Sequence, residues 1–184
     1  KELVRIDPAK SITSIGPGGD TRWTLTKDAA RGLWGWAGGA QPDPQKAQDI
    51  ASALYLITIK DVVPDPAKVQ TGLDKPVTIR ADTPEGVVYT LKIGAKADED
   101  SYYASLAVTG EYADTRPPVK DEKPDDKAKN DKAYADALPK LREQMQKEKK
   151  FSDWTYQLPK YNAELLIRDR AQLMPEKKPD AKKK

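Results

Sequence analysis

Three consecutive apolar segments joined by short polar connections constrain the fold of this chain more than any other feature. They cover residues 77–81, 87–93 and 102–108, and they carry the β-branched and aromatic residues that favour strands. A turn at 84–86 separates the first two, and a loop at 94–100 separates the second from the third. Because connections this short join neighbouring strands in antiparallel orientation, the pattern predicts an antiparallel β-sheet.

The N-terminal part of the chain continues this pattern. Short apolar pieces at 3–6 and 12–15 flank Asp7-Pro8, which is typical of a turn. Residues 21–27 then alternate between apolar and polar side chains, and an aromatic return strand follows at 33–36. These segments are expected to add strands to the same sheet.

Helices are predicted at 44–57 and 161–173. Asp43 is a good N-cap, and Pro44 suits the first helical position. Five apolar residues then recur at helical spacing and are expected to face the sheet: Ala47, Ile50, Ala51, Leu54 and Ile57. Further strands are predicted at 59–63 and 151–158. The predicted fold class is therefore α+β, with an antiparallel sheet and helices packed on one face.

The composition changes at Arg116, where a long charged insertion begins. Residues 117–132 are rich in Pro, Lys and Asp, so we expect a mobile segment. A modest apolar stripe from Tyr134 to Met145 predicts a helix that starts or kinks near Pro139. The sequence thus predicts four parts, in order from the N-terminus: a main domain at 1–115, a charged, partly helical insertion at 116–150, a strand and helix completing the same domain at 151–174, and a disordered basic tail at 175–184.

The chain contains no histidine and no cysteine. This excludes Ser-His-Asp triads, thiol nucleophiles and zinc sites built on His or Cys. The acidic run Asp98-Glu99-Asp100 lacks the spacing of an EF-hand loop, so it is interpreted as a solvated turn. We therefore expect no catalytic residue, no metal and no cofactor. A carboxylate pair for hydrolysis stays open as an alternative, because the chain has 29 Asp and Glu residues.

Charge and hydropathy restrict the partners further. The 32 basic and 29 acidic residues leave a net charge of only +3, and both signs are mixed between Lys120 and Lys150. Both observations argue against nucleic-acid binding. No apolar run reaches the roughly 20 residues that a membrane span requires. Because the chain begins at Lys1 without a Met, we interpret it as a fragment. Membrane contact is expected only through a segment absent from this chain.

Aromatic residues are the richest candidates for ligand or partner contact. Their faces stack on sugars and bases, but tryptophan in a strand more often fills a core. Tyr102 and Tyr103 are adjacent, so they point to opposite faces of their strand. Trp23 is one of the four tryptophans weighed in this way. The candidate contact residues are Trp34, Trp36, Tyr103 and Trp154.

Several motifs resemble those of a known bacterial family. They are a Trp-bearing strand at 34–36, an apolar helix segment at 50–56 ahead of Val62-Val63, Gly-Leu-Asp-x-Pro at 72–76, Leu-x-Ile-Gly at 91–94, and Trp154-Thr155-Tyr156 followed by Ala163-Glu164-Leu165-Leu166. Together they resemble the domain-of-unknown-function 4340 family, which is described as gliding-motility-like or as an auxiliary of ABC-type transporters. The charged segment 116–150 has no counterpart in this pattern. The resemblance implies an extracytoplasmic domain held by an N-terminal membrane helix, without established catalytic residues.

The expected function is that of a non-catalytic binding or scaffold domain on the periplasmic side, auxiliary to an ABC-type export or gliding-motility-like system. Its partner would be a protein, such as a membrane transporter subunit. One alternative is a carbohydrate-binding module, which an exposed row of Trp and Tyr would favour. Another is a carboxylate-based hydrolase, which two facing carboxylates in a cleft would favour.

Overall fold

A computed structural model describes residues 1–6 and 9–176. It confirms the α+β class: an antiparallel sheet of eight strands carries helices packed against it. The strand order is β4-β3-β2-β7-β8-β9-β10-β6. The bounds are β2 Ser11–Ile15, β3 Thr21–Lys27, β4 Trp34–Gly35, β6 Asp61–Val62, β7 Val77–Asp82, β8 Val87–Asp98, β9 Ser101–Gly110 and β10 Tyr156–Pro159. The expected turn at Asp7-Pro8 and most of the expected basic tail, 177–184, lie outside the described residues.

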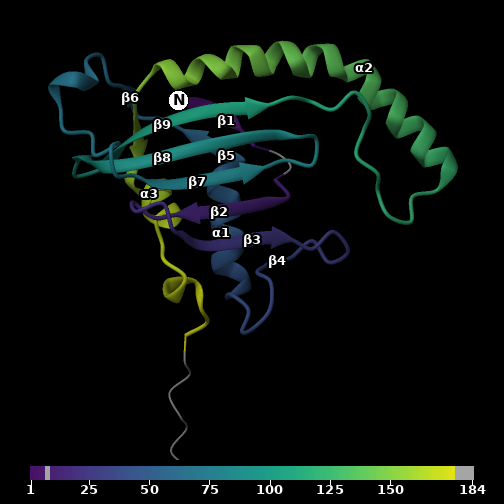
Figure 1. The fold of residues 1–184 in the computed structure, drawn as a ribbon, viewed down its shortest axis with the longest axis horizontal. Helices are drawn as coiled ribbons and strands as arrows, with labels where there is room; N and C mark the ends of the chain where they lie inside the picture. Colours follow the sequence, from purple (N-terminus) through teal and green to yellow (C-terminus); the bar gives the residue numbers. More distant parts are fainter. Residues whose placement is uncertain (7–8, 177–184) are drawn as a thin grey trace, which may run out of the picture.

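The remaining elements flank this sheet. β1 (Glu2–Arg5) and β5 (Leu56–Thr58) pair with each other in a small second sheet. The helices are α1 (Pro44–Tyr55), α2 (Pro124–Glu148) and α3 (Lys160–Leu166). Short 3₁₀ turns cover Pro66–Lys68, Lys149–Asp153 and Ala171–Leu173. In Figure 1, α1 crosses behind the central strands, and α2 runs along the top of the view beside β9.

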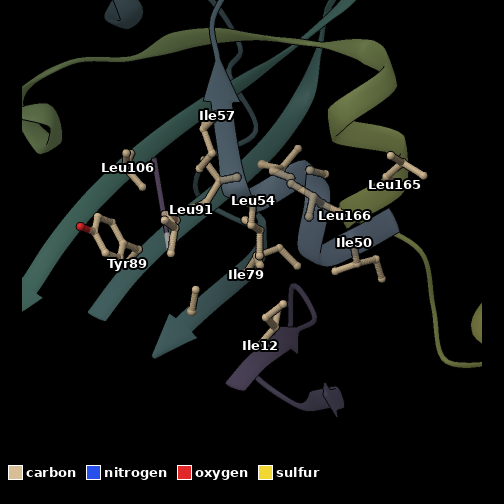
Figure 2. Packing of buried hydrophobic residues seen from close by; sticks show 14 of the residues in the cluster. Ile12, Ile50, Leu54, Ile57, Ile79, Tyr89, Leu91, Leu106, Leu165 and Leu166 are labelled. Atoms are coloured by element: carbon tan, nitrogen blue, oxygen red, sulfur yellow. The ribbon is translucent and has the colours of Figure 1, made fainter. Parts of the chain in front are cut away.

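The register of the sheet separates a core face from an open face. Ile79 pairs with Leu91, and Leu91 pairs with Leu106, so three buried side chains form one row across β7, β8 and β9. Figure 2 shows this row facing Leu54 of α1 and Leu166 of α3. Because side chains alternate along a strand, neighbouring residues such as Thr90 point to the opposite face. The helices α1 and α3 therefore cover one face of the sheet, as the sequence predicts.

The helix α1 begins as predicted and ends earlier. The Asp43 carboxylate accepts hydrogen bonds from the Gln45 and Lys46 backbone N–H groups at 2.9 and 3.1 Å. Ala47, Ile50 and Leu54 are buried as expected. Ile57 is buried too, but it lies in β5, because the segment after Tyr55 pairs with β1. Two positions differ from the predicted stripe: Ala51 is only partly buried and Ala53 is buried instead.

Several predicted boundaries in the strands are wrong. The segment predicted as a strand at 59–63 contains only the two residues of β6. The predicted loop 94–100 is mostly strand, because β8 continues through two irregularities to Asp98. A tight turn then follows, in which the Asp98 carboxylate accepts a hydrogen bond from the Asp100 N–H at 2.8 Å. The acidic run is therefore a hairpin turn whose Asp98 also pairs with Lys60.

The C-terminal elements are shorter than predicted. The strand expected at 151–158 begins only at Tyr156, and a 3₁₀ turn precedes it. The helix expected at 161–173 ends at Leu166. The next two backbone carbonyls accept hydrogen bonds from strand β3, which ties the chain there to the sheet. Arg22 donates to the Ile167 carbonyl and Trp23 donates to the Arg168 carbonyl, each at 2.9 Å.

The charged insertion contains more helix than predicted. α2 begins at Pro124, ten residues ahead of Tyr134, and runs through Pro139 without ending there. Arg116 connects the segment ahead of α2 to the first turns of the helix, because it forms ion pairs with Glu122 and with Asp131. Most of α2 is exposed, so water can bind the backbone carbonyl that Pro139 leaves without a donor. Only the C-terminal end of α2 enters the core, through Met145 and Glu148.

Limited proteolysis tests the prediction of a mobile segment, now narrowed to residues 117–123. Lys120 and Lys123 are exposed and lie outside regular structure. Such backbone opens to a protease at little free-energy cost. We expect the first tryptic cut within residues 9–176 to fall after Lys120, as identified by mass spectrometry, because trypsin does not cleave the bond between Lys123 and Pro124. A first cut after Arg80 or Lys92, both in the sheet, would contradict this prediction.

Candidate binding surfaces

Two of the predicted contact residues, Trp34 and Trp36, line a groove at one edge of the sheet. This Trp34–Trp36 groove has a volume of about 680 Å³ and is bordered by Lys27, Leu33 and Pro42. It lies at β4, the terminal strand, which pairs with β3 through Thr26–Gly35 and Lys27–Trp34. The groove is larger than the two other pockets described below.

The two indole rings in this groove are largely covered. Trp34 and Trp36 are 8% and 7% exposed. The Arg170 guanidinium lies 4.6 Å from the Trp36 ring centroid, and the Lys27 ammonium lies 5.9 Å from that of Trp34. The Trp36 ring N–H donates to the Ala40 carbonyl at 2.8 Å. These contacts fix both rings as part of the core cluster, and they leave little open face for stacking on a sugar.

Trp154 lies at the opposite end of the sheet and is 54% exposed. It borders a shallow hollow of about 470 Å³, which we call the Trp154 hollow. The side chains that line it are mostly apolar: Leu3, Ile59, Val62, Phe151, Trp154 and Tyr156. The Phe151 backbone carbonyl accepts hydrogen bonds from the Trp154 N–H and the Tyr156 hydroxyl at 3.3 and 3.0 Å. The 3₁₀ turn before β10 thus fixes the backbone at Trp154, and the side chain of this residue is left exposed.

The structure does not bring the four predicted residues together. Trp34 and Trp36 share a groove at β4, whereas Trp154 belongs to the β6 end of the sheet. Tyr103 is partly buried on β9 and pairs with Gln157 of β10. Its neighbour Tyr102 is buried on the core face, so the expectation that these two tyrosines point to opposite faces is confirmed.

A third pocket lies between α2 and the edge of the sheet's core face. We call it the tyrosine pocket; its volume is about 270 Å³ and its main lining residues are Glu85, Tyr89, Tyr112, Tyr134, Leu141 and Glu148. Glu148 is only 8% exposed. Its carboxylate accepts hydrogen bonds from the Tyr89 hydroxyl at 3.0 Å and from the Gln144 amide at 3.1 Å.

The titration of the tyrosines reflects this environment. Burial raises the pKa of Tyr89 well above its usual range, and the negative charge of Glu148 raises it further. Burial also raises the pKa of Tyr112, again with contributions from Glu148 and then Glu85. Both phenols are therefore neutral at physiological pH, and each presents an uncharged ring to the pocket.

Sequence reasoning missed the tyrosine pocket. Leu138, Leu141, Met145 and Glu148 share one side of α2 at helical spacing, and the last of these is charged. A carboxylate that continues an apolar stripe is a signal for a buried polar contact. The partner residue, Tyr89, comes from a strand 59 positions away, and the local pattern of α2 carries no information about it.

The described part of the chain contains neither a cluster of metal ligands nor a helix that could span a membrane. In residues 1–6 and 9–176, no three acidic side chains gather closely enough to hold a metal ion. None of the helices described here combines the length and hydropathy that crossing a membrane requires. Comparison with known proteins gave no match to any family model, curated protein or solved structure.

Proposed function

We propose that this chain is a non-catalytic extracytoplasmic binding or scaffold domain that docks an extended apolar segment of a protein partner on the Trp154 hollow. The observation that supports this proposal is the exposed side chain of Trp154, which borders a hollow lined mostly by apolar side chains. Exposed tryptophans in apolar surroundings are enriched among the residues that dominate binding energy at protein interfaces.

The position of the hollow favours an extended segment as its occupant. Val62 lines the hollow and belongs to β6, the terminal strand of the sheet. β6 pairs with β10 on one side, and no strand within the described ranges pairs with its other side. An added strand can hydrogen-bond to such an edge while its alternate side chains enter a neighbouring pocket. Backbone pairing and apolar burial would then act together at this edge.

The setting of this function comes from the resemblance to the domain-of-unknown-function 4340 family. It suggests a domain auxiliary to an ABC-type export or gliding-motility-like system, and membrane transporter subunits as partners. Gly72 and Gly94, which belong to two of the motifs behind the resemblance, lie in direct contact. The family assignment remains a proposal.

The test compares Trp154→Ser with Tyr161→Ser in detergent extracts of native membranes. Tyr161 is 72% exposed on α3 and serves as the matched control. A partner should co-purify with the wild type and with the control, and it should be lost with Trp154→Ser. After purification, that partner should bind Trp154→Ser at least about tenfold more weakly, as loss of an interface tryptophan predicts. Thermal melts of both variants should match the wild type, because neither side chain is in the core.

Two outcomes would reject this proposal. Equal affinity of the purified partner for Trp154→Ser and wild type would exclude the hollow as the docking surface. Saturable binding of an oligosaccharide, lost in Trp154→Ser, would instead support the carbohydrate-binding alternative, since Trp154 is the most exposed of the four predicted contact residues.

A further inference from the structure

The tyrosine pocket contains a buried carboxylate without a matching cation. Both hydrogen-bond donors to Glu148 are neutral, namely the Tyr89 hydroxyl and the Gln144 amide. No Lys or Arg in the described ranges lies within ion-pair distance of Glu148. A buried carboxylate that lacks an opposite charge is costly, and a bound cation removes that cost.

The aromatic rings of the pocket add a second attraction for a cation. Tyr89, Tyr112 and Tyr134 come from β8, the segment after β9, and α2, and they line one cavity. The hydroxyls of Tyr89 and Tyr134 donate to Glu148 and to the Ala113 carbonyl, at 3.0 and 2.8 Å. With these hydroxyls engaged, the rings remain as the binding surface, and the face of an aromatic ring attracts a positive charge.

The other charged groups of the pocket leave its balance negative. Glu85, in the turn between β7 and β8, adds a second carboxylate. Arg5 also borders the pocket, but its guanidinium pairs with Glu2 at 3.3 Å and lies 5.5 Å from the Tyr55 ring centroid. Arg142, on the same helix as Glu148, pairs with Asp114 at 2.6 Å.

We propose that the tyrosine pocket binds an alkylammonium or guanidinium group, such as the head of a lysine- or arginine-like ligand. Its volume of about 270 Å³ suits a charged head with a short alkyl chain. The charged head would lie between the tyrosine rings and form an ion pair with the Glu148 carboxylate. Leu141 offers an apolar contact for the chain. This site is separate from the Trp154 hollow and does not rest on the proposed function.

The same pocket is also the place to consider a carboxylate-based hydrolase, because Glu85 and Glu148 both line it. Each oxygen of the Glu148 carboxylate already accepts a hydrogen bond, from Tyr89 and from Gln144 respectively. A carboxylate oxygen can accept two hydrogen bonds, so each oxygen keeps one position for a donor from the ligand. An ammonium head can use such a position without any reaction at Glu148, so the cation proposal does not depend on hydrolysis.

The experiment titrates the full chain with n-butylammonium chloride and with n-butanol, its neutral counterpart, at constant ionic strength. Amide NMR shifts at Tyr89, Tyr112 and Gln144 report binding. We expect saturable shifts with n-butylammonium at a Kd on the order of 1 mM, as suits a ligand of few atoms, and no saturable shift with n-butanol. Glu148→Gln should weaken binding at least about tenfold, since it removes the buried charge and keeps the shape of the side chain.

Two more variants and a peptide complete the design. Glu143→Gln is the matched control, because Glu143 is exposed on α2 and pairs with Lys147; binding should be unchanged. Tyr112→Leu, which keeps Glu148, should weaken binding severalfold and guards against an effect of Glu148→Gln on folding. The peptide acetyl-Gly-Lys-Gly-amide separates the sources of the cation. Binding of the peptide assigns a protein side chain as the source, whereas binding of n-butylammonium without binding of the peptide assigns a free amine; both results support the proposal.

Three results would overturn it. One is the absence of a saturable shift with either cation. Another is an equal response to n-butanol, which would show apolar filling of the pocket without charge recognition. The third is equal affinity of wild type, Glu148→Gln and Tyr112→Leu, which would place the cation elsewhere.

Discussion

Replacing Leu54 by alanine is expected to lower the free energy of unfolding by about 2–5 kcal/mol. Leu54 is 1% exposed and lies between α1 and the sheet, where Figure 2 shows it close to Leu91 and Ile79. The substitution removes buried methyl groups and leaves a cavity that rigid strands on one side cannot fill. Urea unfolding followed by circular dichroism measures the change, as a lower midpoint at an unchanged slope.

The matched control for this variant is Gln48→Ala on the same helix. Gln48 is exposed, and its side-chain amide donates a hydrogen bond to the Ser52 hydroxyl at 3.2 Å on the surface of the helix. Alanine has the highest helix propensity, so the control should unfold within about 0.5 kcal/mol of the wild type. If Leu54→Ala unfolds at the same urea concentration as Gln48→Ala, the packing of α1 on the sheet is not as the structure places it.

The sequence predicts the local elements well where the spacing of the apolar residues agrees with the turn or cap residues at the ends of the segment. Strands β7, β8 and β9 follow from alternation between turn residues, and α1 follows from Asp43-Pro44 ahead of a helical apolar period. The spacing of apolar residues alone does not predict where α1 ends and β5 begins. Ile57 continues the apolar pattern of the helix, but its backbone pairs with β1, a contact made with a distant part of the chain.

Strand order and site geometry depend on such distant contacts. β10 lies between β9 and β6, and the residues of these three strands are separated by long stretches of sequence. No local pattern specifies that neighbourhood. For the same reason, the sequence identifies Trp34 and Trp154 as candidates for contact, but it does not predict which of the two is buried. The sheet covers the first ring at its β4 end, and the 3₁₀ turn leaves the second exposed.

Replacing Gly94 by alanine is expected to destabilise the protein by about 3 kcal/mol, the upper part of the range for overpacking. The loop that contains Thr71 and Gly72 lies directly on β8 at this point, and the Ala95 N–H donates to the Thr71 carbonyl at 2.8 Å. A Cβ at residue 94 would be 2.1 Å from the Thr71 carbonyl oxygen and 3.0 Å from the Gly72 carbonyl carbon. Both are backbone atoms, so the loop must move away and weaken this hydrogen bond.

Gly18→Ala is the control for this last prediction. A Cβ at Gly18 has its nearest neighbour, a carboxylate oxygen of Asp20, at 3.5 Å, which is an ordinary contact. Alanine there restricts the unfolded chain without strain, so stability should be unchanged or rise by up to about 1 kcal/mol. Urea midpoints of the two variants should therefore move in different directions or by very different amounts. Equal midpoints would mean that the loop at 71–76 does not lie on Gly94. The contact between the Gly-Leu-Asp-x-Pro and Leu-x-Ile-Gly segments would then have no structural basis.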